Sequence, residues 1–141
     1  ENGNISIICN GKMTSIYETL KYKISNIHYI DNISLIGDLS IENNHIILDK
    51  NSFSFKDDIS SATYLINLFY LYDKPINIIG KNYCNKLISD DNYFIYTPFT
   101  IVSLLRPDLF KKQINIGSIN YFNYNVQIMN YINKYINYWI E

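Results

Sequence analysis

The spacing of apolar residues changes several times along the chain, and each change predicts a new element. Ile5 to Cys9 is β-branched and almost wholly apolar, which predicts a strand covered on much of both faces. Asn10-Gly11 follows this run and predicts a tight hairpin. From Ser15 to Ile24 the apolar residues recur every three to four positions, which indicates a short helix.

Two strands and the turn between them are predicted from Ile33 to Asp49. The residues expected to share one face of the first strand are Ile33, Leu35, Gly37, Leu39 and Ile41. Asn43-Asn44 then turns the chain into a second strand, His45–Leu48. A further short strand is expected over Ser52–Phe55.

The middle of the chain predicts two helices separated by a short strand. Ile59 to Tyr72 is apolar around most of its circumference, which is typical of a helix in the centre of a domain. Asp57-Asp58 precede it and can cap its first turn. Pro75 prevents the helix from continuing. Ile76–Ile79 then predicts a strand, and Tyr83–Ser89 a helix.

The C-terminal third predicts two more helices. Thr97-Pro98 is a favourable helix start, because proline lacks the N–H that is unsatisfied at the first helical position, and this helix ends before Pro107. Gly117 to Asn123 is expected to be a loop. Asn125 to Glu141 is amphipathic, and its apolar stripe is expected to contact the core rather than a partner. A β-rich front and a helical back predict an α+β fold, with an N-terminal β-hairpin and a small sheet flanked by a helical cluster.

Composition limits the classes of partner. Ile, Asn and Tyr make up 61 of the 141 residues, and eleven of the twelve basic residues are Lys, which indicates an AT-rich genome such as that of a large DNA virus, a protozoan parasite or an AT-rich bacterium. The net charge of −1 supplies no basic face, so nucleic acid is not an expected partner. No run of about 18 apolar residues predicts a membrane span. Cys9 and Cys84 suggest free buried thiols in a reducing, cytoplasmic setting.

The search for chemistry finds no convergent set of residues. His28, His45, Cys9 and Cys84 lack the short paired spacing of a zinc site, and they define no nucleophile and base. Asp90-Asp91 are expected to end a helix. Gly80 stands alone and makes no phosphate-binding loop. We therefore expect no enzyme, no cofactor and no metal.

Residues 58–95 resemble the middle of a BTB (POZ) domain. Asp58-Ile59-Ser60 is similar to that family's entry into its central helix, and Tyr70-Leu71-Tyr72 is similar to the end of the helix. Ile76-Asn77-Ile78 and Asn82 fit the strand and the helix start that follow. Ile5 to Lys12 resembles the opening hairpin. The resemblance covers about residues 4–105, and the missing N-terminal swap helix makes it similar to the short form of elongin C or of channel tetramerisation domains.

The resemblance implies a non-enzymatic protein-interaction domain that self-associates or serves as an adaptor for a cullin-type ubiquitin ligase. It divides the chain into a BTB-like domain at 1–105 and a helical extension at 106–141 that packs on it. The protein interface that it implies consists of Asp73, Lys74, Pro75, Asp90, Asp91, Tyr93 and Tyr96. The alternative is a viral or parasite structural domain of unrelated α+β fold that binds a host protein or carbohydrate through aromatic residues. Since the chain opens on Glu1-Asn2-Gly3, we expect a piece of a longer protein.

Overall fold

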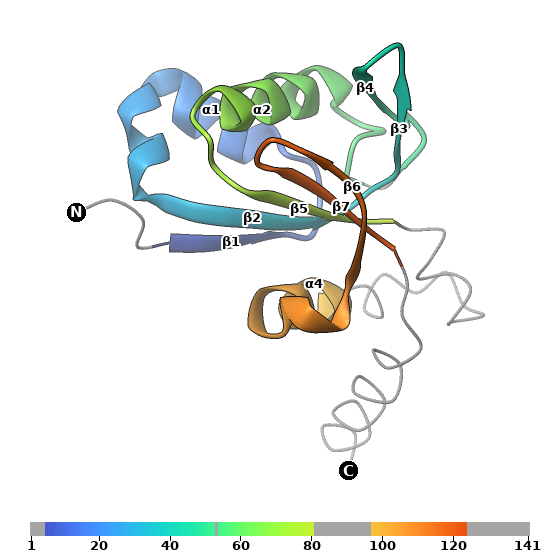
Figure 1. Cartoon of the computed structure of the whole chain (residues 1–141). Helices are drawn as coiled ribbons and strands as arrows, with labels where there is room; N and C mark the ends of the chain where they lie inside the picture. Colours follow the sequence, from blue (N-terminus) through green and yellow to red (C-terminus); the bar gives the residue numbers. More distant parts are fainter. Residues whose placement is uncertain (1–4, 53, 81–96, 124–141) are drawn as a thin grey trace.

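The computed structural model describes residues 5–52, 54–80 and 97–123, and its centre is a five-stranded sheet in the order β1-β2-β5-β7-β6 (Figure 1). The strands are β1 (Ile5–Cys9), β2 (Ile30–Ile36), β5 (Ile76–Ile79), β6 (Lys111–Ile116) and β7 (Ile119–Asn123). The first four in this order, β1, β2, β5 and β7, run parallel, and β6 is antiparallel at the edge. Parallel strands are covered on both faces, which accounts for the nearly continuous apolar sequences of β1 and β5.

Helices cover both faces of this sheet. Figure 1 shows α1 (Thr14–Tyr22) and α2 (Ile59–Leu71) over one face, and α4 (Thr97–Leu105) against the other. Short 3₁₀ turns, η1 (Ile24–Tyr29) and η3 (Pro107–Leu109), follow α1 and α4. Among the described residues, no helix combines the length and the apolar character needed to cross a bilayer.

The main core lies between α2 and the sheet. Leu65 and Phe69 of α2 are fully buried there against Ile33 and Leu35 of β2. Since side chains alternate along a strand, Ser34 faces the opposite side, where its hydroxyl lies 3.1 Å from that of Ser103 on α4. Both faces of β2 are therefore buried, as its position inside the sheet requires.

A capping residue holds the starts of α1 and α2 together. The side chain of Asp58 accepts a hydrogen bond from the Ser61 backbone N–H at 3.2 Å, which confirms the predicted cap. The hydroxyl of Thr14, at the start of α1, donates to the same carboxylate at 2.5 Å. These hydrogen bonds to the charged form lower the pKa of Asp58, the Thr14 bond most.

The hairpin predicted around Asn43-Asn44 is confirmed. β3 (Leu39–Glu42) pairs antiparallel with β4 (His45–Leu48), outside the main sheet. Asn43 and Asn44 have φ of 49° and 64°, as a two-residue type I′ turn requires. The helix over 59–72, the strand over 76–79 and the helix that starts at 97 are also confirmed.

Several predicted elements are wrong. Asn10-Gly11 leads into α1 and makes no hairpin, because β1 pairs parallel with β2 and the return path needs a crossover helix. The strand expected over Ser52–Phe55 is wrong for its described residues: Ser52 lies in a turn, and its carbonyl accepts from the N–H groups of Phe55 and Lys56. The loop expected over 117–123 is mostly strand β7, which lies inside the sheet between β5 and β6.

A fold that combines helices with a sheet is confirmed. The predicted N-terminal hairpin and small sheet are wrong, because the structure has a mostly parallel five-stranded sheet instead. The predicted helices over 83–89 and 125–141 lie outside the described residues. The division into 1–105 and 106–141 therefore stays a prediction, although β6 and β7 already join residues 111–123 to the main sheet.

Candidate functional site

A cavity of about 510 Å³ opens beside the carboxyl ends of β2 and β7, under the β3–β4 hairpin. Its lining comes from three places, the end of β2 with the start of β3, the end of β4, and β7: Asp38, Leu39, Ser40, Ile47, Leu48, Asp49, Lys50, Asn51 and Tyr121. Open parallel sheets bind ligands at the carboxyl ends of their strands. We call this space the carboxyl-edge cavity.

Asp38 is the most deeply placed charged group of this lining. It follows β2 directly after Gly37, and only 8% of its surface is exposed. The hydroxyl of Tyr121, on β7, donates to its Oδ1 at 3.2 Å. Tyr121 is itself buried. Two strands that are not neighbours in the sheet thus hold this carboxylate at the cavity wall.

The main chain around Asp38 is fixed by the base of the hairpin. Its carbonyl accepts from the N–H of Asp49 at 2.8 Å, which closes β3 against β4. The Asp49 side chain in turn accepts from the Asn51 N–H at 2.9 Å, and the Ser52 hydroxyl donates to the Asp49 carbonyl at 2.9 Å. This local turn sets Lys50 and Asn51 at the cavity rim, where both are exposed.

An aromatic ring supports the chain on the other side of Asp38. A Cβ added to Gly37 would lie 2.6 Å from Cε2 of Phe55, so the ring occupies the space that a side chain would need. Phe55 is completely buried. Only glycine allows β2 to pass this close to the ring, and the next residue is Asp38.

The first strand-to-helix turn, Cys9 to Met13, lies at the same edge of the sheet. The Cys9 thiol donates to the Gly11 carbonyl at 3.2 Å and is buried. Burial raises the pKa of this thiol. A buried thiol with a raised pKa is a poor nucleophile, and its burial confirms the prediction made for Cys9.

The other candidate residues do not converge on a reaction centre. His28 packs edge-on against Tyr72 with ring centroids 5.8 Å apart, and His45 is exposed at the start of β4. Within residues 5–52, 54–80 and 97–123, no group of three or more histidine, cysteine or acidic side chains is placed to hold a metal. Cys84 lies outside these ranges.

The residues predicted as a protein interface are far from the carboxyl-edge cavity in the fold, or are not described. Asp73, Lys74 and Pro75 form the turn between α2 and β5, which is at the amino ends of the parallel strands. Asp90, Asp91, Tyr93 and Tyr96 lie outside the described residues. The interface therefore stays untested as a set of residues.

Sequence reasoning missed Asp38 and Tyr121. The alternating pattern predicts a long strand through Gly37-Asp38, and Tyr121 falls in the loop expected over 117–123. A usable signal was present, since an apolar run that ends in Gly-Asp is typical of a parallel strand followed by a polar residue at its carboxyl end. This Gly-Asp signal points to a site only when the strand is known to be parallel.

Comparison with known proteins identifies the fold. No protein-family model and no curated protein matches the chain. The crystal structure of the type III effector protein XopQ complexed with adenosine diphosphate ribose matches with a TM-score of 0.68 and 10% identity, over 86% of this chain and 53% of XopQ. The effector protein XOO4466 matches with a TM-score of 0.69 and 12% identity, over 87% of this chain and 55% of its own. The chain spans about half the length of these two proteins, with which it shares the fold.

These matches correct the functional expectation. The resemblance to a BTB domain is wrong, and with it the roles of cullin adaptor and ubiquitin-ligase component. The BTB-like pattern of residues 58–95 consists of a helix, a short turn and a strand. A helix that connects two parallel strands of one sheet produces the same order of elements. The neighbours are effector proteins, so they lend no support to the viral or parasite origin suggested by composition.

Proposed function

We propose that this protein binds a ribose-containing ligand of the adenosine diphosphate ribose class in the carboxyl-edge cavity. The observation that carries the proposal is the position of Asp38, a carboxylate 8% exposed in the wall of a cavity of about 510 Å³. This volume lies within the range of about 300–1,000 Å³ that is typical of small-molecule sites.

The chemistry of the lining suits such a ligand. A carboxylate is the type of acceptor that takes the adjacent hydroxyls of a ribose, and Asp38 places one at the cavity wall, where it also accepts from Tyr121. An acidic residue that follows the second strand is the usual ribose-binding group of dinucleotide-binding α/β sheets. Lys50 at the rim supplies positive charge for a phosphate, and Leu39 and Ile47 supply apolar surface for a base.

The structural similarity to XopQ supports this ligand class. XopQ is the protein that was crystallised with adenosine diphosphate ribose, and its fold is the one found here. XopQ is 10% identical to this chain, and 53% of its length is matched. Since a shared fold does not fix a shared ligand, the ligand of XopQ tells us which class of compound to test here.

We further propose that the ligand is bound without being converted. No pair of described side chains at the cavity combines a nucleophile with a base that would activate it, and the nearby Cys9 thiol is buried with a raised pKa. Prolonged incubation with adenosine diphosphate ribose, followed by chromatography, should recover the ligand unchanged. Formation of AMP, adenosine or free ribose phosphate would show that the protein is an enzyme.

Calorimetric titration with adenosine diphosphate ribose tests the site. Asp38→Asn keeps the size of the side chain but removes its charge, and we expect the dissociation constant to rise about 10- to 100-fold, the value of roughly 1.5–3 kcal/mol for hydrogen bonds to a charged group. Asp57→Asn, at an exposed carboxylate outside the cavity, is the matched control and should bind like the wild type.

A pair of small ligands tests the contact with ribose itself. Ribose 5-phosphate should compete with adenosine diphosphate ribose better than 2-deoxyribose 5-phosphate does, because the deoxy sugar lacks one of the two hydroxyls assigned to Asp38. The preference should disappear in Asp38→Asn. Equal competition by both sugars in the wild type, or unchanged affinity in Asp38→Asn, would remove this site from consideration.

A further inference from the structure

Tyr121 connects the core of the protein to the carboxyl-edge cavity. Its strand, β7, is hydrogen-bonded on both sides, to β5 and to β6. The residue belongs to the apolar core cluster, and only 5% of its surface is exposed. It also lines the carboxyl-edge cavity, and its hydroxyl donates to Oδ1 of Asp38 at 3.2 Å. Because the strand is paired on both sides and the ring is packed in the core, this hydroxyl has a fixed position.

The backbone of Asp38 is held by hydrogen bonds on either side of its Cα atom. The N–H of the preceding residue, Gly37, donates to the Ile79 carbonyl at 3.0 Å. The carbonyl of Asp38 itself accepts from the Asp49 N–H at 2.8 Å. These bonds fix the main chain but not the carboxylate, whose terminal torsion has a broad range in aspartate. The hydrogen bond from Tyr121 narrows this range, because it ties one carboxylate oxygen to a fixed donor.

We propose that Tyr121 is a positioning residue of the ribose site, and that it makes binding selective for ribose over 2-deoxyribose. This inference rests on the proposed function, since it concerns how Asp38 meets the sugar. A carboxylate held in one orientation is ready for two adjacent hydroxyls, whereas a carboxylate that rotates must first be ordered by the ligand. Tyr121 therefore acts on the ligand through Asp38.

The length of the hydrogen bond sets the size of the expected effect. Hydrogen bonds between a hydroxyl and an oxygen acceptor are usually about 2.7–2.8 Å long. The bond from Tyr121 is longer, at 3.2 Å, so we expect the effect of a typical rather than a strong hydrogen bond. Tyr121→Phe removes the hydroxyl and keeps the ring that packs in the core. It should raise the dissociation constant for adenosine diphosphate ribose about 3- to 10-fold.

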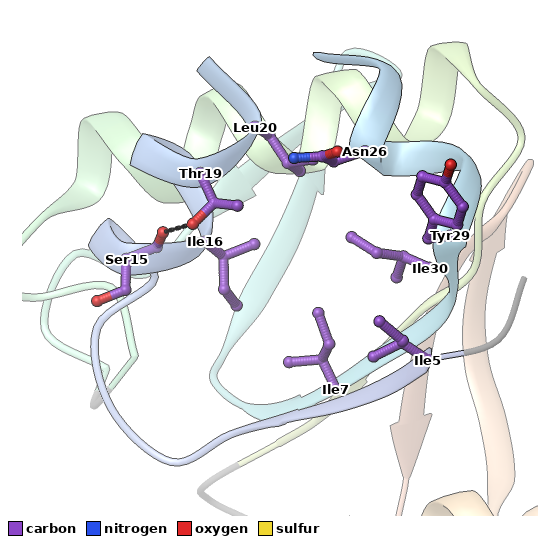
Figure 2. A pocket seen from close by; sticks show the side chains of 9 residues that line it. All are labelled: Ile5, Ile7, Ser15, Ile16, Thr19, Leu20, Asn26, Tyr29 and Ile30. Atoms are coloured by element: carbon purple, nitrogen blue, oxygen red, sulfur yellow. Dashed lines mark hydrogen bonds between the residues drawn. The ribbon is translucent and has the colours of Figure 1, made fainter. Parts of the chain in front are cut away.

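A second cavity supplies the matched control. It has a volume of about 380 Å³ and lies between β1, α1 and η1. Figure 2 shows the side chains of Ile7, Ile16 and Ile30 pointing into the same open space, and none of the residues that line it is charged. Tyr29 also lines this second cavity. Tyr29→Phe therefore removes a tyrosine hydroxyl from a cavity whose lining has no carboxylate, and it should bind the ligand like the wild type.

Calorimetric titration with adenosine diphosphate ribose, and competition by ribose 5-phosphate and 2-deoxyribose 5-phosphate, test the role of Tyr121. Besides binding more weakly, Tyr121→Phe should lose most of the wild-type preference for the ribose compound. In an Asp38→Asn background the same change should have little further effect, because the carboxylate that Tyr121 orients is absent. A purely structural role would instead weaken both sugars equally, and would do so in either background.

If Tyr121→Phe does not fold, Asp38→Glu decides the question. Glutamate keeps the charge but moves the carboxylate by one methylene relative to the Tyr121 hydroxyl, so it should also lose the preference for ribose. A preference that survives the variant tested, or a Tyr29→Phe variant that binds as weakly as Tyr121→Phe, would overturn the proposal even if Asp38→Asn weakens binding as expected. A wild-type protein that binds neither adenosine diphosphate ribose nor ribose 5-phosphate would refute the proposed function itself, and the role of Tyr121 with it.

Discussion

Replacing Gly37 with alanine tests whether the ring of Phe55 determines the path of the chain into Asp38. The new Cβ would lie 2.6 Å from Cε2 and 2.7 Å from Cζ of that ring. Neither side has room to yield, since Phe55 is fully buried and the Gly37 N–H is held by the Ile79 carbonyl at 3.0 Å. The backbone of Gly37 is not left-handed, so the effect is a steric one.

The size of the effect follows from two opposing contributions. Forcing a methyl group into a packed core costs about 1–3 kcal/mol. Alanine restricts the unfolded chain more than glycine does, which returns about 0.4–1 kcal/mol. We therefore expect Gly37→Ala to lower the free energy of unfolding by about 1–2 kcal/mol.

Urea denaturation of a double-mutant cycle separates this clash from other causes. Phe55→Leu removes the ring atoms that the new Cβ would meet, so Gly37→Ala should cost little in that background, with a coupling of at least about 1 kcal/mol. Gly11→Ala is the control, since its Cβ would have no atom within 4 Å. If Gly37→Ala is as stable as Gly11→Ala, or if the two changes at 37 and 55 are additive, the packing argument for Asp38 is wrong.

Two further predictions concern the β6–β7 turn and the start of α2. Gly117 has φ of +55°, and a Cβ there would also lie 2.8 Å from Cε2 of Tyr70, so Gly117→Ala should lower the free energy of unfolding by about 1 kcal/mol or more in thermal or urea melts. In a Tyr70→Ala background, which removes the ring, Gly117→Asn should cost less than Gly117→Ala because asparagine tolerates this conformation, and equal losses there would refute the backbone explanation. The pKa of Asp58 is lowered in the folded state, chiefly by the Thr14 and Ser61 hydrogen bonds, so its stabilising contribution is present above the pKa of the unfolded chain and is lost as the pH falls through the folded pKa. Asp58→Asn should therefore be less stable than the wild type at neutral pH and should lose less stability on acidification, and parallel stability curves for the two proteins would contradict this assignment.

The local elements were predictable where the signal is contained in a few adjacent residues. The helix over Ile59–Leu71 follows from its apolar sequence and from Asp58 at its cap, and the β3–β4 hairpin follows from Asn43-Asn44. Each depends on backbone and side-chain preferences within about one turn of chain. The candidate site does not depend on such local preferences, because Asp38 and Tyr121 lie far apart in sequence and are brought together only by the sheet.

The errors share one physical cause. Asn10-Gly11 turns the chain equally well into a strand or a helix, and a short apolar run does not state whether its neighbour is parallel. The same run of helix, turn and strand is compatible with a BTB domain and with a crossover in a parallel sheet, so the pattern of residues 58–95 does not distinguish the two folds. Strand β7, which contains Tyr121, was missed because its Asn-rich flanks are typical of a loop.

By itself, the sequence of this protein determined the approximate position of the described helices α1, α2 and α4, the cap of α2, the β3–β4 turn, and the absence of charge along β1. Only the tertiary structure decided that β1, β2, β5 and β7 run parallel, and therefore that Asp38 and Tyr121 meet at a cavity while β1 is left as an edge. The reason is the range of the interactions. Caps and turns act between neighbours in sequence, whereas strand order is set by burial of apolar faces between segments far apart in the chain.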